Sequence, residues 1–320
     1  MTAIPRPRPG PRRTAGGAAI VLAMLLAALA ATIAATLFAD QQRWTRMVTH
    51  RAEQAQAQAL AMAGVQWARQ IINGDARAVD HLREPWAVAL PPIPFENGEI
   101  RGAIADAQGR LNVNALGNPP ATPPATDFER NRIARLFAPY GDIAAAMNAI
   151  GDWMDSDAIP RPDGAEDAYY GDRSVPGLAA NAPVLRVAEL AAVRGVTLPA
   201  LAAVAPFLTA LPPGTAVNVN TAPLEVLATF IDGLSGADLA AFIANRDQKP
   251  FASLADFRTR LPPGAKIANE SLLGVTTNYF YVSVEARQGT TIARARALLQ
   301  RGSGSGSQAP WPEIVWQVVE

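Results

Sequence analysis

Residues 18–39 read AAIVLAMLLAALAATIAATLFA, an uncharged run of small and apolar side chains. As a helix that rises about 1.5 Å per residue, this run covers roughly 33 Å, the thickness of the hydrocarbon core of a bilayer. The arm before it has no acidic residue, and its arginines are Arg6, Arg8, Arg12 and Arg13. Because positively charged flanks stay in the cytoplasm, the residues after Asp40 are expected on the other side of the membrane. The run therefore predicts a single membrane pass; in a bacterium this would place the span in the inner membrane and the C-terminal domain in the periplasm.

Two simpler explanations of the apolar run stay open. A cleaved secretory signal has the same order of basic and apolar residues, although its core is usually only about 7–15 residues long. The second explanation is an ordinary membrane anchor that is followed by a separate, unrelated helix. Beyond the run, apolar side chains recur mostly every three or four residues until Asn73–Gly74, a natural helix stop. A single helix from Ala18 to Ile72 would be roughly 80 Å long, with its second half packed against a globular head.

The composition narrows the possible functions. The chain has 320 residues, 49% of them hydrophobic, which is enough for a sizeable core and two ordinary domains. Lys and Arg number 28, as do Asp and Glu, so a basic polyanion binder is not expected. The chain has no cysteine and only two histidines, His50 and His81. Disulfides, thiolate metal sites and cysteine nucleophiles are therefore excluded, and histidine-centred catalysis is poorly provided for.

Strand-like stretches lie on both sides of an alanine-rich, helix-like region. The expected strands are residues 99–106, 110–114, 279–286, 290–299 and 313–319. Turns are expected at Gln108–Gly109 and Gln288–Gly289, and irregular segments at the proline-rich residues 90–94, the connector 117–126 and the Gly/Ser tract 302–307. This order predicts an α/β head in which a small antiparallel sheet is interrupted by a large all-α domain.

The start of the chain resembles the leader of type IV pilin-like proteins. Arg-Thr-Ala-Gly-Gly precedes Ala18-Ala19-Ile20-Val21-Leu22, and in that family a prepilin peptidase cuts after a glycine. The resemblance implies cleavage after Gly17, with Ala18 as the new N-terminus and the apolar helix retained. Most such subunits carry Glu at the fifth mature position, where this chain has Leu22. The K-type minor pseudopilin of type II secretion is the member known for lacking this glutamate, and it also has a large helical insert in its sheet.

An acidic segment, GDWMDSDAIPRPDGAEDAYYGD, occupies residues 151–172. Carboxylates at this density repel one another unless solvent or a cation separates them, and a hard cation such as calcium suits an all-oxygen ligand set. Ile159 and Pro160 exclude an EF-hand loop, and a solvated acidic loop without an ion is the plain alternative. Asp152 and Asp155, three residues apart at the end of an expected helix, should share one face.

The same segment closely matches the signature of the K-type pseudopilins, which bind calcium. The resemblance implies a structural calcium site with Asp155, Asp157 and Glu166 as the first candidate ligands and Asp152, Asp167 and Asp172 as further ones. Trp153, Tyr169 and Tyr170 are expected to pack around it. Paired carboxylates also serve glycosidases, but no sugar-lined cleft, phosphate loop or catalytic motif is indicated, so the chain is not expected to be an enzyme.

A short repeated motif favours a different function. Leu111-Asn-Val-Asn114 recurs as Val217-Asn-Val-Asn220, and the second copy begins a stretch that resembles a helix-hairpin-helix module of DNA-uptake proteins, with Asn220 or Thr221 as a helix cap. Such modules bind phosphate through a hairpin with nearby basic residues, whereas residues 231–238 carry two aspartates and no basic residue. A membrane-anchored DNA-binding protein is therefore the alternative, which salt-sensitive binding of duplex DNA would identify.

Together these features resemble the general secretion pathway protein K family along nearly the whole chain. The expected organisation is a leader at residues 1–17, the transmembrane part of a long helix at 18–39, a periplasmic helix and the first head strands at 40–114, an inserted all-α domain at 115–272 and closing strands at 273–320. The resemblance implies a subunit that joins I- and J-type minor pseudopilins at the tip of the pseudopilus. It also implies processing by prepilin peptidase, contacts with other type II secretion components, and no nucleic acid partner.

Overall fold

The computed structural model describes residues 16–117, 123–140, 144–302 and 310–320. The chain divides into two compact units, residues 1–56 and 57–320, and each is described by itself. Residues 1–15 of the expected leader, residues 118–122 of the expected connector and most of the Gly/Ser tract lie outside the described residues.

The first unit is helical wherever it is described. It belongs to α1, Gly16–Asn73, a single helix of 58 residues. Residues 17–50 are exposed along the whole helix, and the apolar run within them is long enough to cross a membrane. The prediction of one unbroken helix is confirmed, and the alternative of a separate second helix after the anchor is wrong, because no break occurs between residues 39 and 73.

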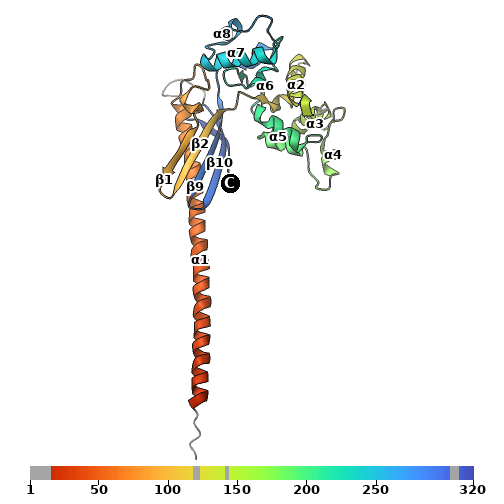
Figure 1. Cartoon of the computed structure of the whole chain (residues 1–320). Helices are drawn as coiled ribbons and strands as arrows, with labels where there is room; N and C mark the ends of the chain where they lie inside the picture. The colour runs from red at the N-terminus through yellow and green to blue at the C-terminus, as the bar shows by residue number, and fades with distance from the viewer. Residues whose placement is uncertain (1–15, 118–122, 141–143, 303–309) are drawn as a thin grey trace, which may run out of the picture. The chain divides into compact units, whose positions relative to one another are not determined.

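The second unit contains a five-stranded sheet whose neighbouring strands are all antiparallel (Figure 1). Its order is β1-β2-β9-β10-β11, with bounds Leu90–Phe95, Gly98–Asp106, Tyr279–Gln288, Thr291–Gln300 and Glu313–Val319. Alternate residues of β9 and β10 are buried, as expected of strands with one face on a core. Gly289, with φ +56°, makes the tight turn between these two strands.

One face of the sheet packs against the end of α1 that lies in this unit. The buried hydrophobic side chains of α1 are Ala57, Ala61, Val65, Ala68 and Ile72, which form one stripe on the helix. They pack with buried β9 and β10 side chains such as Phe280 and Ala295. Helix and sheet approach closely at Gly64, where a Cβ atom would lie 2.6 Å from a methyl group of Val284. The small residues of α1 thus allow the long helix to lie directly on the sheet.

Two of the local predictions around β2 are wrong. The proline-rich residues 90–94 are not a loop but form most of β1, an edge strand whose missing N–H groups cost nothing on the unpaired side. Residues 110–114 do not form a hairpin with β2. Instead β3, Leu111–Asn112, pairs in parallel with β4, Leu208–Thr209, and a 3-10 helix, η2, follows at Val113–Leu116.

The chain leaves the sheet after β2 and returns at β9, and the residues between form the insert. Its α-helices are α2 Pro123–Phe137, α3 Ala144–Met154, α4 Asp167–Gly171, α5 Leu198–Val204, α6 Leu224–Leu227, α7 Gly236–Gln248 and α8 Leu254–Thr259. Further strand pairs are β5 Val217–Asn218 with β8 Leu273–Gly274, and β6 Ile231–Asp232 with β7 Lys266–Ile267. The remaining 3-10 helices of the insert are η3 Ala138–Tyr140, η4 Val187–Ala192, η5 Ala205–Phe207 and η6 Glu270–Leu272, whereas η1, Pro85–Ala87, precedes β1. The insert is therefore mainly helical rather than purely so, and part of the expected connector, residues 123–126, already belongs to α2.

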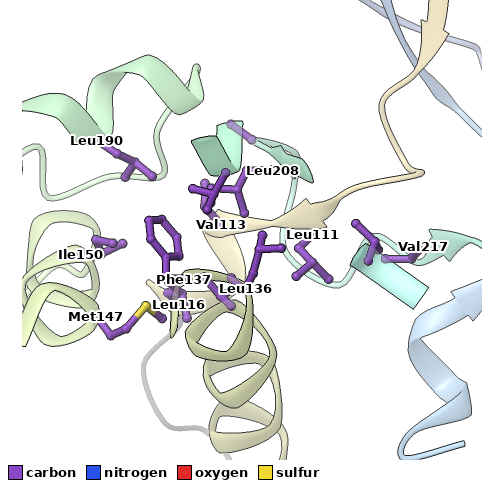
Figure 2. Close-up of a cluster of buried hydrophobic side chains, with 14 of the residues drawn as sticks. Leu111, Val113, Leu116, Leu136, Phe137, Met147, Ile150, Leu190, Leu208 and Val217 are labelled. Carbon is purple, nitrogen blue, oxygen red and sulfur yellow. The ribbon is translucent and has the colours of Figure 1, made fainter. Parts of the chain in front are cut away.

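A separate hydrophobic core holds the insert together. Figure 2 shows Phe137 of α2 and Met147 and Ile150 of α3 directed toward the same centre as Leu190 and Val113. The aromatic side chains Phe242, Phe251 and Phe257 extend this core between α7 and α8, with ring centroids 5.0–5.7 Å apart. The insert thus has a hydrophobic core of its own beside the α1–sheet core.

The repeated Asn motif is a structural device. Asn114 donates to the carbonyl of Val184 at 3.0 Å and accepts from its N–H at 2.9 Å, and Asn220 exchanges the same two bonds with Phe251 at 3.0 and 2.7 Å. Each asparagine thereby anchors a loop that has no strand partner at that point. The expected cap is wrong: the N-cap of α6 is Pro223, and Thr221 donates to Asp106 instead.

Candidate metal site

The acidic segment begins where α3 ends. Asp152 lies in the last turn of α3 and Asp155 directly after it. Both carboxylates pair with Nη1 of Arg161, at 2.6 Å for Asp152 and 2.5 Å for Asp155, so the expectation that they share a face is confirmed. The chain then loops out and returns at Glu166, the N-cap residue of α4. The loop is held by this arginine, whose role the sequence did not reveal.

Three carboxylates converge across this loop. Asp155, Asp157 and Glu166 each offer an oxygen that lies within 4.8 Å of the other two. Asp155 and Glu166 are only 4% and 5% exposed, whereas Asp157 is open to solvent. These are the three residues that the sequence placed first among the candidate ligands, and the structure brings them together from the end of α3, the loop and the start of α4.

Several oxygens of this group have no hydrogen-bond partner among the described residues. They are Oδ1 of Asp155 and both oxygens of Glu166, all buried. A buried carboxylate oxygen without a partner loses its hydration and receives nothing in return, a cost of about 1–3 kcal/mol or more. No group among the described residues satisfies these three atoms, so they are available to a cation or to water.

The pKa values show the same imbalance. The pKa of Glu166 is raised to about 7, chiefly because burial disfavours the charged form and further because Asp155 and other acidic neighbours repel that charge. The pKa of Asp155 is also raised, by burial first, while its bonds to Arg161 oppose the shift. Two negative charges at this site are thus unfavourable until a further positive charge is present.

Asp152 is placed to support the group rather than to join it. Its Oδ2 accepts from the backbone N–H groups of Arg161 at 3.1 Å and Ala165 at 2.9 Å, and its Oδ1 pairs with the Arg161 side chain. The loop must pass tightly around this carboxylate, because a Cβ atom on Gly164 would lie 1.8 Å from Oδ2. Only glycine fits there, so Asp152 fixes the loop that carries Asp157 toward Glu166.

Asp167 and Asp172 lie outside the convergent group. Oδ1 of Asp167 accepts from the N–H of Ala179 at 2.8 Å, and Asp172 is an exposed C-cap residue of α4. Around the site, Trp153 and Tyr170 pack edge to face with centroids 4.9 Å apart, and Tyr169 meets Tyr170 at 5.2 Å. Tyr170 is buried, whereas Tyr169 remains partly exposed beneath the guanidinium of Arg194. The aromatic residues therefore pack around the loop as expected.

The donor set suits a hard cation. It consists of carboxylate oxygens, with exposed Asp157 leaving room for water or carbonyl ligands, and it contains no nitrogen or sulfur ligand. Calcium accepts six to eight such oxygens in irregular geometry, whereas magnesium demands a near-ideal octahedron. The three residues thus fit the calcium ion implied by the acidic signature.

Another group of carboxylates, which the sequence did not single out, lies near the end of α1. Asp75, Asp80 and Glu84 also bring oxygens within 4.8 Å of one another. Here Arg301 supplies the positive charge, with Nη2 2.6 Å from Asp75 and 2.9 Å from Asp80. Oε2 of Glu84 accepts from Nε1 of Trp86 at 2.8 Å. The protein itself thus supplies a counter-charge for two of these three carboxyl groups.

At the turn of the helix-hairpin-helix stretch, residues 231–238, polar side chains are engaged by the protein itself. Asp232 pairs with Arg135 at 3.1 Å, and Ser235 caps α7 by accepting from the N–H of Asp238 at 3.2 Å. Arg246 of α7 is buried, and its Nη1 donates to the carbonyls of Val219 and Ala222. In this stretch the arginine that could meet a phosphate is used to join α7 to the Asn motif.

The fold defines the chain as a pilin-like subunit with a helical domain inserted in its sheet. It resembles a solved chain in the crystal structure of the GspK–GspI–GspJ complex from the enterotoxigenic Escherichia coli type 2 secretion system. The TM-score is 0.66 at 23% identity, and the match covers 88% of this chain and 98% of the other. At this identity the likeness shows the shared fold.

Sequence comparisons lead to the particular family. Two family models described as type II secretion system protein K match residues 109–213 and 217–276. The type II secretion system protein K of Pectobacterium carotovorum subsp. carotovorum is 30% identical over 272 residues, covering 79% of this chain and 82% of the relative. That of Pseudomonas aeruginosa is 29% identical over 303 residues, covering 91% and 90%. The chain belongs to the type II secretion system protein K family, and its function is that of a minor pseudopilin.

Proposed function

We propose that the chain takes its place at the tip of the pseudopilus, in a complex with the I- and J-type minor pseudopilins, and that this complex starts the assembly that exports folded proteins across the outer membrane. The helical insert between β2 and β9 carries the proposal. A subunit in the filament shaft is packed by neighbours above and below, and an insert of more than 150 residues leaves little room for them. The resemblance to a chain solved together with GspI and GspJ supports the same partners.

The N-terminal segment would anchor the subunit in the inner membrane. In the proposed maturation, prepilin peptidase cleaves after Gly17, and Ala18 becomes the first residue of the apolar helix. Both residues lie exposed at the start of α1, where an enzyme has access to them. At position 22 this chain has leucine in place of the glutamate that other subunits use to pair with the N-terminal amine of a neighbour. A subunit at the tip of the filament has no further subunit to pair with in this way, so it does not need that glutamate. The role is assembly in the membrane and periplasm rather than catalysis.

Co-expression tests the assembly and the processing together. The full chain, produced with prepilin peptidase and the I- and J-type subunits, should co-purify with both and have an intact mass that begins at Ala18. A Gly17→Leu variant should keep the leader, whereas Gly16→Leu serves as the matched control with a similar change one residue earlier. Cleavage after residue 39, or filaments that carry the chain along their shafts, would contradict the proposal.

The proposed cofactor is one calcium ion held by Asp155, Asp157 and Glu166. It would supply the positive charge that their buried oxygens lack and fix a loop that has few apolar contacts of its own. The role is structural, because the ion joins the end of α3 to the start of α4. Calorimetric titration of chelator-treated chain should show calcium binding, and Glu166→Gln should weaken that binding at least about tenfold. Equal binding by the variant would remove Glu166 from the site.

A further inference from the structure

The two edges of the five-stranded sheet differ in a way that points to their use. At β1, Pro91, Pro92 and Pro94 lack N–H groups, so this edge offers another strand few donors. At the opposite edge, β11 reads EIVWQVV and has neither proline nor lysine. Natural sheets block an open edge with such residues unless something covers it. The sequence thus protects one edge and leaves the other available.

The register of β11 identifies the backbone groups that face outward. Arg294 and Glu320 exchange two backbone hydrogen bonds, at 2.8 and 2.9 Å. Because successive residues of a strand point their N–H and C=O groups in opposite directions, Gln317 and Val319 direct theirs away from β10. In the part of the chain that the structure describes, no strand lies on that side. Four backbone groups are therefore in position to pair with an added strand.

The side chains of β11 make this edge apolar on both faces of the sheet. Ile314 and Val319 pack with the core between α1 and the sheet, while Trp316 packs with Tyr281 at 6.2 Å between ring centroids. Val315, the extra residue at a break in the register, is 45% exposed. An added strand would extend both layers and cover side chains that now lie at their margin.

The charges of β11 select the kind of strand. Glu313 is exposed at one end, and Glu320, which follows the other end, is exposed as well and shares its charge with Arg296 at 2.9 Å. If two copies of this chain paired antiparallel through β11, Glu313 of each would approach Glu320 of the other, and like charges in such pairs are unfavourable. A strand with Lys or Arg near these positions and apolar residues between them is complementary.

We propose that β11 pairs with an extended, basic-flanked strand of the neighbouring pilin-like subunit in the tip complex. The inference rests on the proposed assembly with the I- and J-type subunits. The added strand would continue the five-stranded sheet across the interface through the backbone groups of Gln317 and Val319, with its basic residues beside Glu313 and Glu320.

The test compares two substitutions at one position of the full-length chain in detergent. Gln317→Pro removes an outward N–H without removing a bond to β10, whereas Gln317→Ala keeps the N–H and removes only the side chain. The dissociation constant for the purified pair of I- and J-type subunits should rise at least about tenfold for Gln317→Pro and change less than about twofold for Gln317→Ala. Val315→Lys, at an exposed position, should also weaken binding by placing a charge on the edge.

Hydrogen exchange tests the pairing of β11 in the unmodified chain. It therefore still applies if Gln317→Pro folds poorly. The amides of Gln317 and Val319 should exchange fast in the free chain and become protected in the complex. Equal binding by the proline and alanine variants, or unprotected amides in a formed complex, would overturn the β11 inference and leave the proposed assembly intact. Failure of the unmodified chain to bind the pair would overturn both. If the β11 variants altered only self-association, the strand that pairs with β11 would belong to a second copy of this chain, and the inference would be overturned.

Discussion

The two carboxylate groups of the second unit have the same number of members but different surroundings. In the group of Asp75, Asp80 and Glu84, Arg301 pairs with both aspartates, and Asp80 also accepts from the N–H of Thr277 at 2.7 Å. The one buried oxygen of this group without a hydrogen bond among the described residues, Oδ1 of Asp80, lies 2.9 Å from the Arg301 guanidinium. Asp155, Asp157 and Glu166 leave three buried oxygens without a partner among the described residues. Proximity of acidic side chains therefore does not by itself indicate a cation site. The deciding feature is which buried oxygens the protein has already satisfied.

Each group contains one carboxyl whose pKa is raised to about 7, Asp80 in the first and Glu166 in the second. Burial is the main cause in both. At Asp80 the charge of Arg301 and the N–H of Thr277 oppose the shift, whereas at Glu166 the neighbouring aspartates increase it. Burial thus raises the pKa of Asp80 although its ion pair with Arg301 opposes the shift, whereas at Glu166 burial and repulsion act in the same direction.

The largest effect is expected from removing Arg301, the counter-charge of the group formed by Asp75, Asp80 and Glu84. Arg301→Met would leave the buried carboxylates of Asp75 and Asp80 without their counter-charge, and breaking such a pair costs about 3–5 kcal/mol. Urea unfolding followed by tryptophan fluorescence measures the loss. The control is Arg296→Met, which breaks an exposed pair with Glu320 and should cost at most about 1 kcal/mol. Similar losses in the two variants would show that the first group is not held by Arg301.

The sequence predicts the elements of the head well because their signals are local. The apolar run and its continuation predict α1, and alternation with a glycine turn predicts β9 and β10. It fails at β1, because proline argues against a strand until one knows that the strand is at an edge. It also fails at β3, whose partner β4 comes almost 100 residues later. Pairings at that separation leave no pattern in the local sequence.

The sequence predicts which acidic residues converge but not how they are supported. The acidic signature places Asp155, Asp157 and Glu166 together, as the structure shows. The pairing of Arg161 with Asp152 is close in sequence, but a lone arginine in an acidic loop does not announce which carboxylate it neutralises. The ion pairs of Asp75 and Asp80 with Arg301 could not be recognised from the sequence, because Arg301 lies more than 200 residues from Asp80.

A second prediction concerns pH in the absence of calcium. Since the pKa of Glu166 rises from 4.5 to about 7 on folding, the folded state holds an extra proton between these values. The contribution of Glu166 to the unfolding free energy should therefore be greatest below pH 4.5 and fall by about 3 kcal/mol as pH rises through 7. Calcium, which requires the ionised carboxylate, should abolish this fall.

The difference between unfolding curves with calcium and with chelator isolates the second group. The pKa values of Asp75, Asp80 and Asp106 are also raised by burial, and they add to the fall with pH in both conditions. Their contribution cancels in the difference. Glu166→Gln should remove the part of the pH dependence that calcium changes and leave the part that is common to both conditions. If Asp80→Asn removed the calcium-dependent part instead, the ion would bind at Asp75, Asp80 and Glu84, and the assignment to Glu166 would be wrong.

A third prediction compares the two groups as ligands at constant pH. At a calcium concentration of 100 times the dissociation constant, binding to the folded state alone adds about 2.7 kcal/mol to the unfolding free energy. Asp155→Asn should abolish this gain in thermal or urea unfolding at pH 7.5. Asp75→Asn should retain it, although the variant starts from a lower stability because Arg301 loses a partner. Loss of the gain in both variants would mean that calcium acts on the fold as a whole.

The smallest effects distinguish ligands from neighbours within the acidic segment. Asp167→Ala removes the acceptor of the Ala179 N–H and should cost about 1 kcal/mol, while Asp172→Asn, at an exposed helix end, should stay within about 0.5 kcal/mol. Neither should change the calcium dissociation constant more than about twofold, because neither oxygen belongs to the convergent group. The resemblance made both residues candidate ligands. A tenfold weaker affinity in either variant, measured by calorimetry, would show that the loop rearranges around the ion and that convergence without the ion reveals only part of the ligand shell.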